Sequence, residues 1–82
     1  MVTVMNTEKT VKIYVQLLEE GTDTARGTEA VELGGGFYKV LPTPHYDPED
    51  EIWEFLPGSI VKCKKTTDDK GNDMLLAVEK VG

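Results

Sequence analysis

The chain has 82 residues, of which 15 are acidic and 9 basic, and its net charge is −6. This length favours one small domain with a thin core, and the single cysteine, Cys63, excludes an internal disulfide framework. No apolar run approaches the roughly 20 residues of a membrane-spanning helix and no signal-peptide pattern opens the chain, so we expect a cytoplasmic protein.

Alternating side chains predict strands along most of the chain. Residues 1–10 lack a clear period, so we expect a frayed end or a weak strand there, and a single domain over residues 11–82. Residues 11–18 alternate at a period of two, which is a strand signal. The apolar face of this strand consists of Val11, Ile13, Val15 and Leu17, and the other face carries Lys12, Tyr14, Gln16 and Leu18.

Glycines and prolines predict where the turns lie. Residues 19–27 contain two glycines and are expected to form a loop. Three glycines at 34–36 separate two short strand patterns and predict a hairpin. Pro57 and Gly58 suit the second and third positions of a turn. The remaining expected strands are residues 28–33, 37–41, 51–56, 59–67 and 74–81, with a second hairpin turn at residues 68–73.

These elements together predict an all-β fold. No window of eleven residues shows a convincing helical period, and five or six short strands follow one another at turn-like spacing. This spacing is typical of a small antiparallel five- or six-stranded barrel or rolled sheet, in the SH3-like or OB-like size class. Closure would also hide the sheet edges, which favour aggregation when they are exposed.

Negative charge is concentrated in the middle of the chain. Residues 19–54 contain ten acidic and two basic residues, a local balance of −8, whereas residues 1–18 and 55–82 each sum to +1. An acidic surface repels phosphate backbones, which argues against a nucleic-acid partner. It leaves room for a protein partner with a basic surface.

Residues 42–59 contain most of the side chains that are candidates for binding or catalysis. They contain all four prolines, the only His, Trp and Ser, and five carboxylates. We expect Trp53 and Phe55 to anchor the core and Tyr46, between Pro44 and Pro48, to face outward. The candidate protein-contact residues are His45, Tyr46, Asp47, Glu49, Asp50 and Glu51.

The same carboxylates do not form a recognisable metal motif. Asp47, Glu49 and Glu51 stand at alternate positions, but Ile52 occupies the place where an EF-hand loop needs glycine. His45 and Cys63 are too few ligands for a structural zinc site. We therefore predict no metal site and no cofactor.

Catalytic side chains are equally scarce. Ser59, His45 and Asp47, or Cys63 with His45, could in principle form a nucleophilic set, but nothing in their spacing indicates that they meet. Cys63 lies in an alternating strand, where a small apolar packing role is favoured. We predict no catalytic residues, and we expect a protein that is not an enzyme.

Two runs resemble a set of short uncharacterised bacterial single-domain proteins. The first run extends from Val15 to Thr22, and the second has the pattern LPxPxYDPxDExWEFxPGSxVxC from Leu41 to Cys63. The resemblance implies a bacterial, stand-alone domain and assigns no activity or site residue. This chain has Arg26-Gly27 where the pattern has Arg-Pro, a difference that bears on one loop.

The leading hypothesis is therefore a non-enzymatic module that binds a protein through its acidic, proline-rich segment. The alternatives are a module that binds a small molecule or a divalent metal through the same carboxylates, and an accessory subunit of an enzyme. A homo-oligomer is a further option, because Tyr14 and Leu18 lie on the face of the first strand opposite its apolar stripe.

Overall fold

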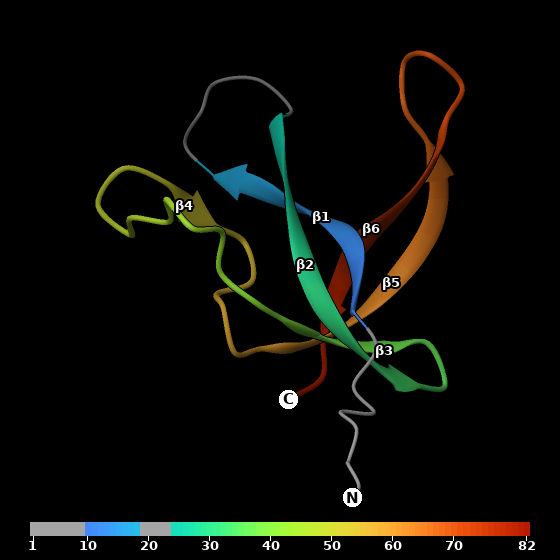
Figure 1. Ribbon diagram of the computed structural model, residues 1–82, viewed down its shortest axis with the longest axis horizontal. Helices are drawn as coiled ribbons and strands as arrows, with labels where there is room; N and C mark the ends of the chain where they lie inside the picture. Colours follow the sequence, from blue (N-terminus) through green and yellow to red (C-terminus); the bar gives the residue numbers. More distant parts are fainter. Residues whose placement is uncertain (1–9, 19–23) are drawn as a thin grey trace, which may run out of the picture.

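The computed structural model describes residues 10–18 and 24–82, and the statements below concern these residues. Expectations for residues 1–9 and 19–23 lie outside the described residues. The described chain contains six strands and no helix (Figure 1). The strands are β1 (Thr10–Leu18), β2 (Thr24–Gly34), β3 (Phe37–Val40), β4 (Ile52–Trp53), β5 (Ile60–Thr67) and β6 (Asp73–Lys80).

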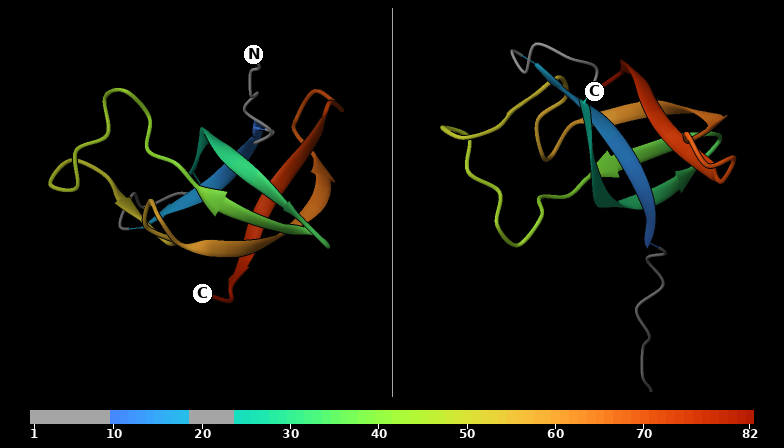
Figure 2. Two further views of the ribbon diagram at one scale, coloured as in Figure 1. Left: turned by 60° about the horizontal axis from the view of Figure 1, so that its bottom comes forward. Right: turned by 90° about the horizontal axis from the view of Figure 1, so that it is seen from above.

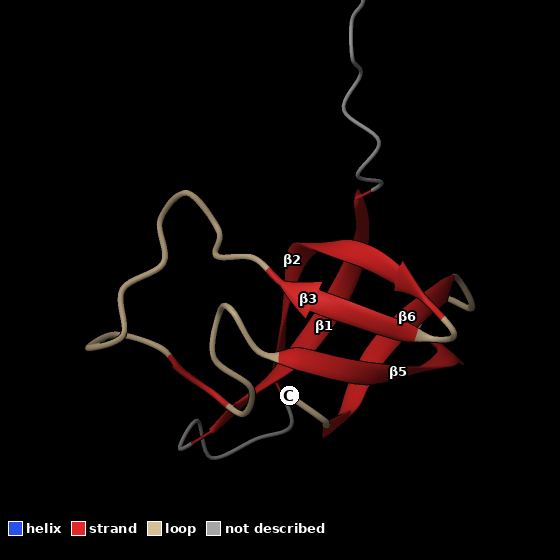
Figure 3. Cartoon of the chain, turned by 90° about the horizontal axis from the view of Figure 1, so that it is seen from below, coloured by secondary structure: helices blue, strands red, loops and turns tan. Residues whose placement is uncertain are grey.

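Five of these strands form a ring of pairings, so the sheet is rolled (Figures 2 and 3). The pairings β1–β2, β2–β3, β3–β5 and β5–β6 are antiparallel, and β6 returns to β1 in a parallel pairing. Four successive reversals bring β6 back in the direction of β1, so the closing pair has to be parallel. The expected all-β rolled sheet is confirmed, and this one pairing makes it mixed rather than wholly antiparallel.

The short strand β4 lies outside the ring. It pairs with the end of β1, where Leu17 is opposite Trp53 and Leu18 is opposite Ile52. The backbone N–H of Glu54 then donates to the carbonyl oxygen of Gln16 at 2.8 Å. β4 therefore attaches the long connection between β3 and β5 to the free edge of β1.

The core lies inside the rolled sheet and follows the expected alternation. Ile13 and Val15 on β1 are fully buried, and Leu18 on the opposite face is exposed. Trp53 and Phe55 are also buried, at 2% and 8% exposure, which confirms their expected core role. The core cluster consists of Ile13, Val15, Leu17, Ala30, Val40, Trp53, Phe55, Val61 and Ala77.

The expected turns are confirmed where glycine has a positive φ. Gly35 and Gly36 have φ of 67° and 85° and join β2 to β3, as a tight two-residue hairpin of the primed type requires. Gly58 has φ of 93°, and the N–H of Ser59 donates to the carbonyl oxygen of Leu56 at 3.0 Å across Pro57-Gly58. A side chain at either turn would strain the backbone.

Two strand boundaries differ from the expectation by more than one residue. Residues 24–27 were expected in a loop but belong to β2, because they pair with β1 as far as Leu17 opposite Thr24. Gly27 is thus a strand residue opposite Tyr14, and an aromatic ring across a strand glycine compensates for its missing side chain. Residues 51–56 were expected to form one strand, but only Ile52 and Trp53 do so, opposite Leu18 and Leu17 of β1.

Candidate functional site

The connection from β3 to β4, residues 41–51, is called the acidic loop below. It extends outward from the rolled sheet (Figures 1 and 3). Within it, Asp47 organises a turn: its carbonyl oxygen accepts from the N–H groups of Asp50 at 3.0 Å and Glu51 at 2.9 Å, and its Oδ1 accepts from the N–H of Glu49 at 2.9 Å. This side-chain turn is the usual role of Asp in loops.

The loop is fixed to β2 at its first residue. The N–H of Leu41 donates to the carbonyl oxygen of Glu29 at 3.0 Å. In return, the Oγ1 of Thr28 donates to the carbonyl oxygen of Leu41 at 2.6 Å. Thr28 is 5% exposed, so this hydrogen bond is shielded from competing water and sets the direction in which the loop leaves the sheet.

The far end of the loop is held by Trp53. The ring of Tyr46 meets the Trp53 ring edge to face, with 4.8 Å between centroids and 68° between planes. The indole Nε1 of Trp53 donates to Glu51 Oε1 at 2.9 Å. The other carboxylate oxygen of Glu51 accepts from Nη2 of Arg26 on β2. One buried tryptophan therefore holds two residues of the loop, and the ion pair to Arg26 links that same end to a second strand.

These contacts lower the pKa of Glu51 below the ordinary glutamate value. The hydrogen bond from Trp53 is the largest cause, followed by the hydrogen bond from Arg26. Both donors favour the charged carboxylate. Glu51 is 21% exposed and Arg26 is 45% exposed, so water weakens the ion pair and the indole hydrogen bond is the better shielded of the two.

The six candidate contact residues fall into two groups. Tyr46 and Glu51 are half-buried and contact Trp53. The expectation that Tyr46 faces outward is wrong, because its ring packs against the core instead. The other four are exposed side chains: His45, Asp47, Glu49 and Asp50.

The nucleophilic candidates do not come together. Ser59 is buried at 7% exposure, whereas His45 is exposed on the acidic loop. Cys63 is partly buried against the core, and burial raises the pKa of its thiol to about 11. Such a thiol stays protonated near neutral pH and is a poor nucleophile. In the described part of the chain, no three His, Cys, Asp or Glu side chains are grouped so that they could hold a metal ion.

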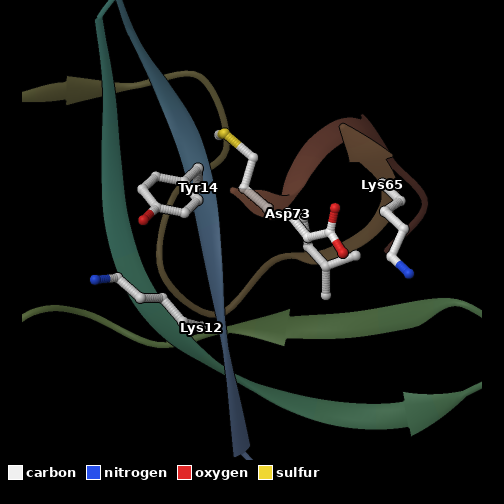
Figure 4. A pocket seen from close by; sticks show the side chains of 6 residues that line it. Lys12, Tyr14, Lys65 and Asp73 are labelled. Atoms are coloured by element: carbon white, nitrogen blue, oxygen red, sulfur yellow. The ribbon is translucent and has the colours of Figure 1, made fainter. Parts of the chain in front are cut away.

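Two of the depressions in the surface of the described sheet border Lys12. One, of about 280 Å³, opens between β1 and the hairpin of β5 and β6 and is lined by Lys12, Tyr14, Lys65, Asp73, Met74 and Leu75 (Figure 4). The other, of about 240 Å³, lies between β2 and the start of the acidic loop and is lined by Lys12, Gly27, Thr28, Glu29, Pro42, Thr43 and Pro44.

Sequence reasoning missed Arg26 and the first depression. Arg26 is 25 positions from Glu51, and no local pattern connects the two. The depression depends on how β6 returns to β1, which only the topology reveals.

No protein-family model matches the chain, and no curated protein or solved structure is significantly similar to it. The functional argument therefore rests on the residues of this chain. No helix in the described residues is long and apolar enough to cross a membrane.

Proposed function

We propose that this protein is a non-enzymatic binding module whose acidic loop contacts a basic surface on a partner protein. The observation that carries the proposal is the position of Glu51, which joins the loop to Trp53 and to Arg26. A loop held in one shape loses less conformational entropy when it binds. The prolines at 42, 44 and 48 restrict the unbound chain in the same way.

The exposed side chains of the acidic loop supply the contact surface. His45, Asp47, Glu49 and Asp50 are exposed while the neighbouring Tyr46 and Glu51 are engaged with the core. Three carboxylates on one projecting loop attract a basic partner and accelerate its approach. The same charges oppose contact with nucleic acid, whose backbone is negative.

We place this module in the bacterial cytoplasm. Support comes from the partly buried thiol of Cys63, which suits a reducing compartment, and from the resemblance to short bacterial proteins. Cell fractionation of the source organism with an antibody against the chain tests the location. Recovery from the membrane or extracellular fraction would refute it.

The proposal is tested with a matched pair of charge-reversal variants. The loop variant is Glu49→Lys with Asp50→Lys, because neither of these side chains holds the loop in place. The control is Asp69→Lys with Glu79→Lys, two exposed residues on the β5–β6 side of the sheet. Each pair of substitutions raises the net charge from −6 by the same amount, so the loop variant and the control have the same total charge.

Tagged wild-type and variant proteins are used to capture partners from a lysate, and each captured protein is then titrated by itself. We expect at least one basic protein to bind the wild type and the control with equal affinity, and to bind the loop variant about tenfold or more weakly. The affinity for the wild type should also fall as salt rises. Equal binding of the loop variant and the control by every partner would refute the acidic loop as the contact surface.

A further inference from the structure

The outer face of β3 and β5 carries three exposed lysines around an exposed phenylalanine. Tyr38 and Val40 of β3 and Val61 of β5 pack in or against the core, so the residues that alternate with them point outward. The outward residues are Phe37, Lys39, Lys62 and Lys64, and all four are exposed. We call these four residues the basic face.

The lysines of the basic face lie on two sides of Phe37. Lys62 is directly opposite Phe37 in the β3–β5 pairing, and side chains at such positions have Cβ atoms about 4.5 to 5.5 Å apart. Lys39 follows two residues along β3, on the same face. Glu79 lies opposite Lys62 on β6, and the three ammonium groups outweigh its carboxylate. The basic face therefore presents a phenyl ring, 36% exposed, in positive surroundings.

The acidic loop presents the opposite combination. Pro48 is exposed and stands between Asp47 and Glu49, which are exposed as well. The hydrogen bond from the Glu49 N–H to Asp47 Oδ1, at 2.9 Å, fixes these two residues around the proline. Proline-rich segments dock on aromatic side chains, and carboxylates pair with lysines. Each surface thus has an apolar ring flanked by charges, and the charges are of opposite sign.

The acidic loop and Phe37 lie at opposite ends of β3. This strand begins at Phe37, next to the β2–β3 turn, and the acidic loop follows its last residue, Val40. In Figures 1 and 3 the loop extends to one side of the sheet and the β2–β3 turn lies on the other. A chain therefore does not bring its own loop to Phe37, and both surfaces are available to a second molecule.

We propose that the basic face binds the acidic loop of a second copy of this chain. Pro48 covers the Phe37 ring, and the carboxylates beside Pro48 face Lys39 and Lys62. A second copy is selected because this chain carries both halves of the match. The inference rests on the proposed function, since it uses the acidic loop as a contact surface, and it names one partner of that surface.

The charges and the size of the contact make it weak. Each copy has a net charge of −6, but at physiological salt charges more than about 8 Å apart are largely screened, so the local match decides. One loop on four side chains belongs with the small interfaces, below roughly 1,200 Å², of weak complexes. We therefore expect a dissociation constant of about 0.1 to 1 mM.

The test removes each surface separately with neutral substitutions. The loop-neutral variant is Glu49→Gln with Asp50→Asn, and the face-neutral variant is Lys62→Gln with Lys64→Gln. Each variant lacks one half of the contact and keeps the other. Substitutions to neutral rather than opposite charges ensure that a mixture of the two forms no new ion pair between the altered surfaces.

A matched control keeps both surfaces. It is Lys70→Gln with Lys80→Gln, two exposed lysines outside the basic face, and it changes the net charge as much as the face-neutral variant does. Thermal melts of all three variants should match the wild type, because every substituted side chain is exposed.

Self-association is measured by amide chemical shifts of the full chain at increasing protein concentration, up to about 2 mM. In the wild type and the control, we expect shifts to change at residues 37–39, 62–64 and 45–50. Each neutral variant alone should associate about fivefold or more weakly. Raising the salt to about 1 M should weaken the wild-type association, because the Debye length falls to about 3 Å.

Mixing the two neutral variants tests the contact directly. The nitrogen-15-labelled loop-neutral variant, titrated with the unlabelled face-neutral variant, should bind with the wild-type affinity and change its shifts at residues 37–39 and 62–64. With the labels exchanged, the shifts should change at residues 45–50. These two results together require the loop of one copy to lie on the basic face of another.

Three results would overturn the proposal: no concentration-dependent shifts in the wild type, equal self-association of the loop-neutral variant and the wild type, or no recovery of affinity in the mixture. If the wild type does not self-associate but the charge-reversed loop still loses a partner from the lysate, this inference alone is refuted and the proposed function stands. If changing the loop alters neither kind of binding, both are refuted.

Discussion

The acidic loop and the contact between β1 and β6 differ in how they are held in place, and the difference is not the one that their secondary structure suggests. The acidic loop has irregular backbone, yet Leu41 is bonded to β2 at one end and Glu51 is bonded to Trp53 and Arg26 at the other. β1 and β6 are regular strands, yet the ladder between them consists of one residue pair, Tyr14 with Leu76. Side-chain contacts thus hold much of the loop in place, whereas the backbone pairing between β1 and β6 is limited to one residue pair.

This difference shows that regular backbone geometry and a firmly held backbone are separate properties. A strand is fully stabilised only when both edges are paired. Residues 10–13 of β1 and 73–75 of β6 have one partner strand each. A loop can be fixed without strand pairing if shielded hydrogen bonds and ring contacts reach the core. The comparison predicts that single changes at the loop anchors have larger effects on stability than changes at the exposed residues of β1 and β6.

The largest effect is expected at Trp53. It is 2% exposed and holds both Tyr46 and Glu51. Trp53→Ala should cost about 3 to 5 kcal/mol, a large fraction of the stability of a domain of this size. Trp53→Phe keeps an aromatic ring but removes the indole donor and should cost less. Urea unfolding followed by far-UV circular dichroism measures both. A small effect of Trp53→Ala would show that the loop and core are independent.

The next effect is expected at Glu51. Glu51→Ala leaves the Trp53 indole N–H without its acceptor and should cost about 1 to 3 kcal/mol. Glu51→Gln keeps an oxygen for the indole but loses the charge that faces Arg26, so it should cost less, about 0.2 to 1 kcal/mol. If the two variants unfold at the same urea concentration, the indole hydrogen bond is not the main anchor.

The lowered pKa of Glu51 also predicts a pH dependence. An unfolded glutamate has a pKa of about 4.3, so the stability from the Glu51 carboxylate is complete above that pH and is lost as pH falls through the lower folded pKa. Below about pH 4.3 the wild type should therefore lose more stability than Glu51→Gln. Emission of the single tryptophan reports the change. Parallel pH profiles of the two proteins would contradict this account.

A smaller effect is expected at Gly58. Its φ of 93° is unfavourable for residues with a Cβ, although no atom lies within 4 Å of the Cβ that a substitution would add. Gly58→Ala should therefore cost about 1 kcal/mol through the backbone alone. Gly58→Asn should cost less, because Asn tolerates positive φ better. Thermal melts test the order, and equal melting temperatures for wild type and Gly58→Ala would refute the strain.

An effect of similar size is expected at Tyr46. Tyr46→Ala removes the edge contact with Trp53 and should cost about 0.5 to 1.5 kcal/mol, whereas Tyr46→Phe should be close to neutral. Urea unfolding at neutral pH measures both changes. A Tyr46→Ala variant as stable as the wild type would mean that the tyrosine ring is free to serve the contact surface after all.

Local patterns predicted much of this fold. The alternation of β1, the core roles of Trp53 and Phe55, and the glycine turns at 35–36 and 58 all depend on residues close in sequence, and each is confirmed. The partnership of Arg26 with Glu51 spans 25 positions and the closing pair of β1 and β6 spans most of the domain, so no local pattern could reveal them. Tyr46 was misplaced because its neighbouring prolines indicated a loop, and loops are usually exposed.

The most direct test of the acidic loop as a preformed contact surface is its backbone order. Nitrogen-15 relaxation of the full chain gives an order parameter for each amide of residues 45–51 other than Pro48. We predict values near about 0.85, as for rigid backbone, in the wild type, and values below about 0.6 in Glu51→Ala. Wild-type values already below about 0.6 would mean that the contacts of Glu51 and Tyr46 with Trp53 do not hold the loop, and would contradict the central claim.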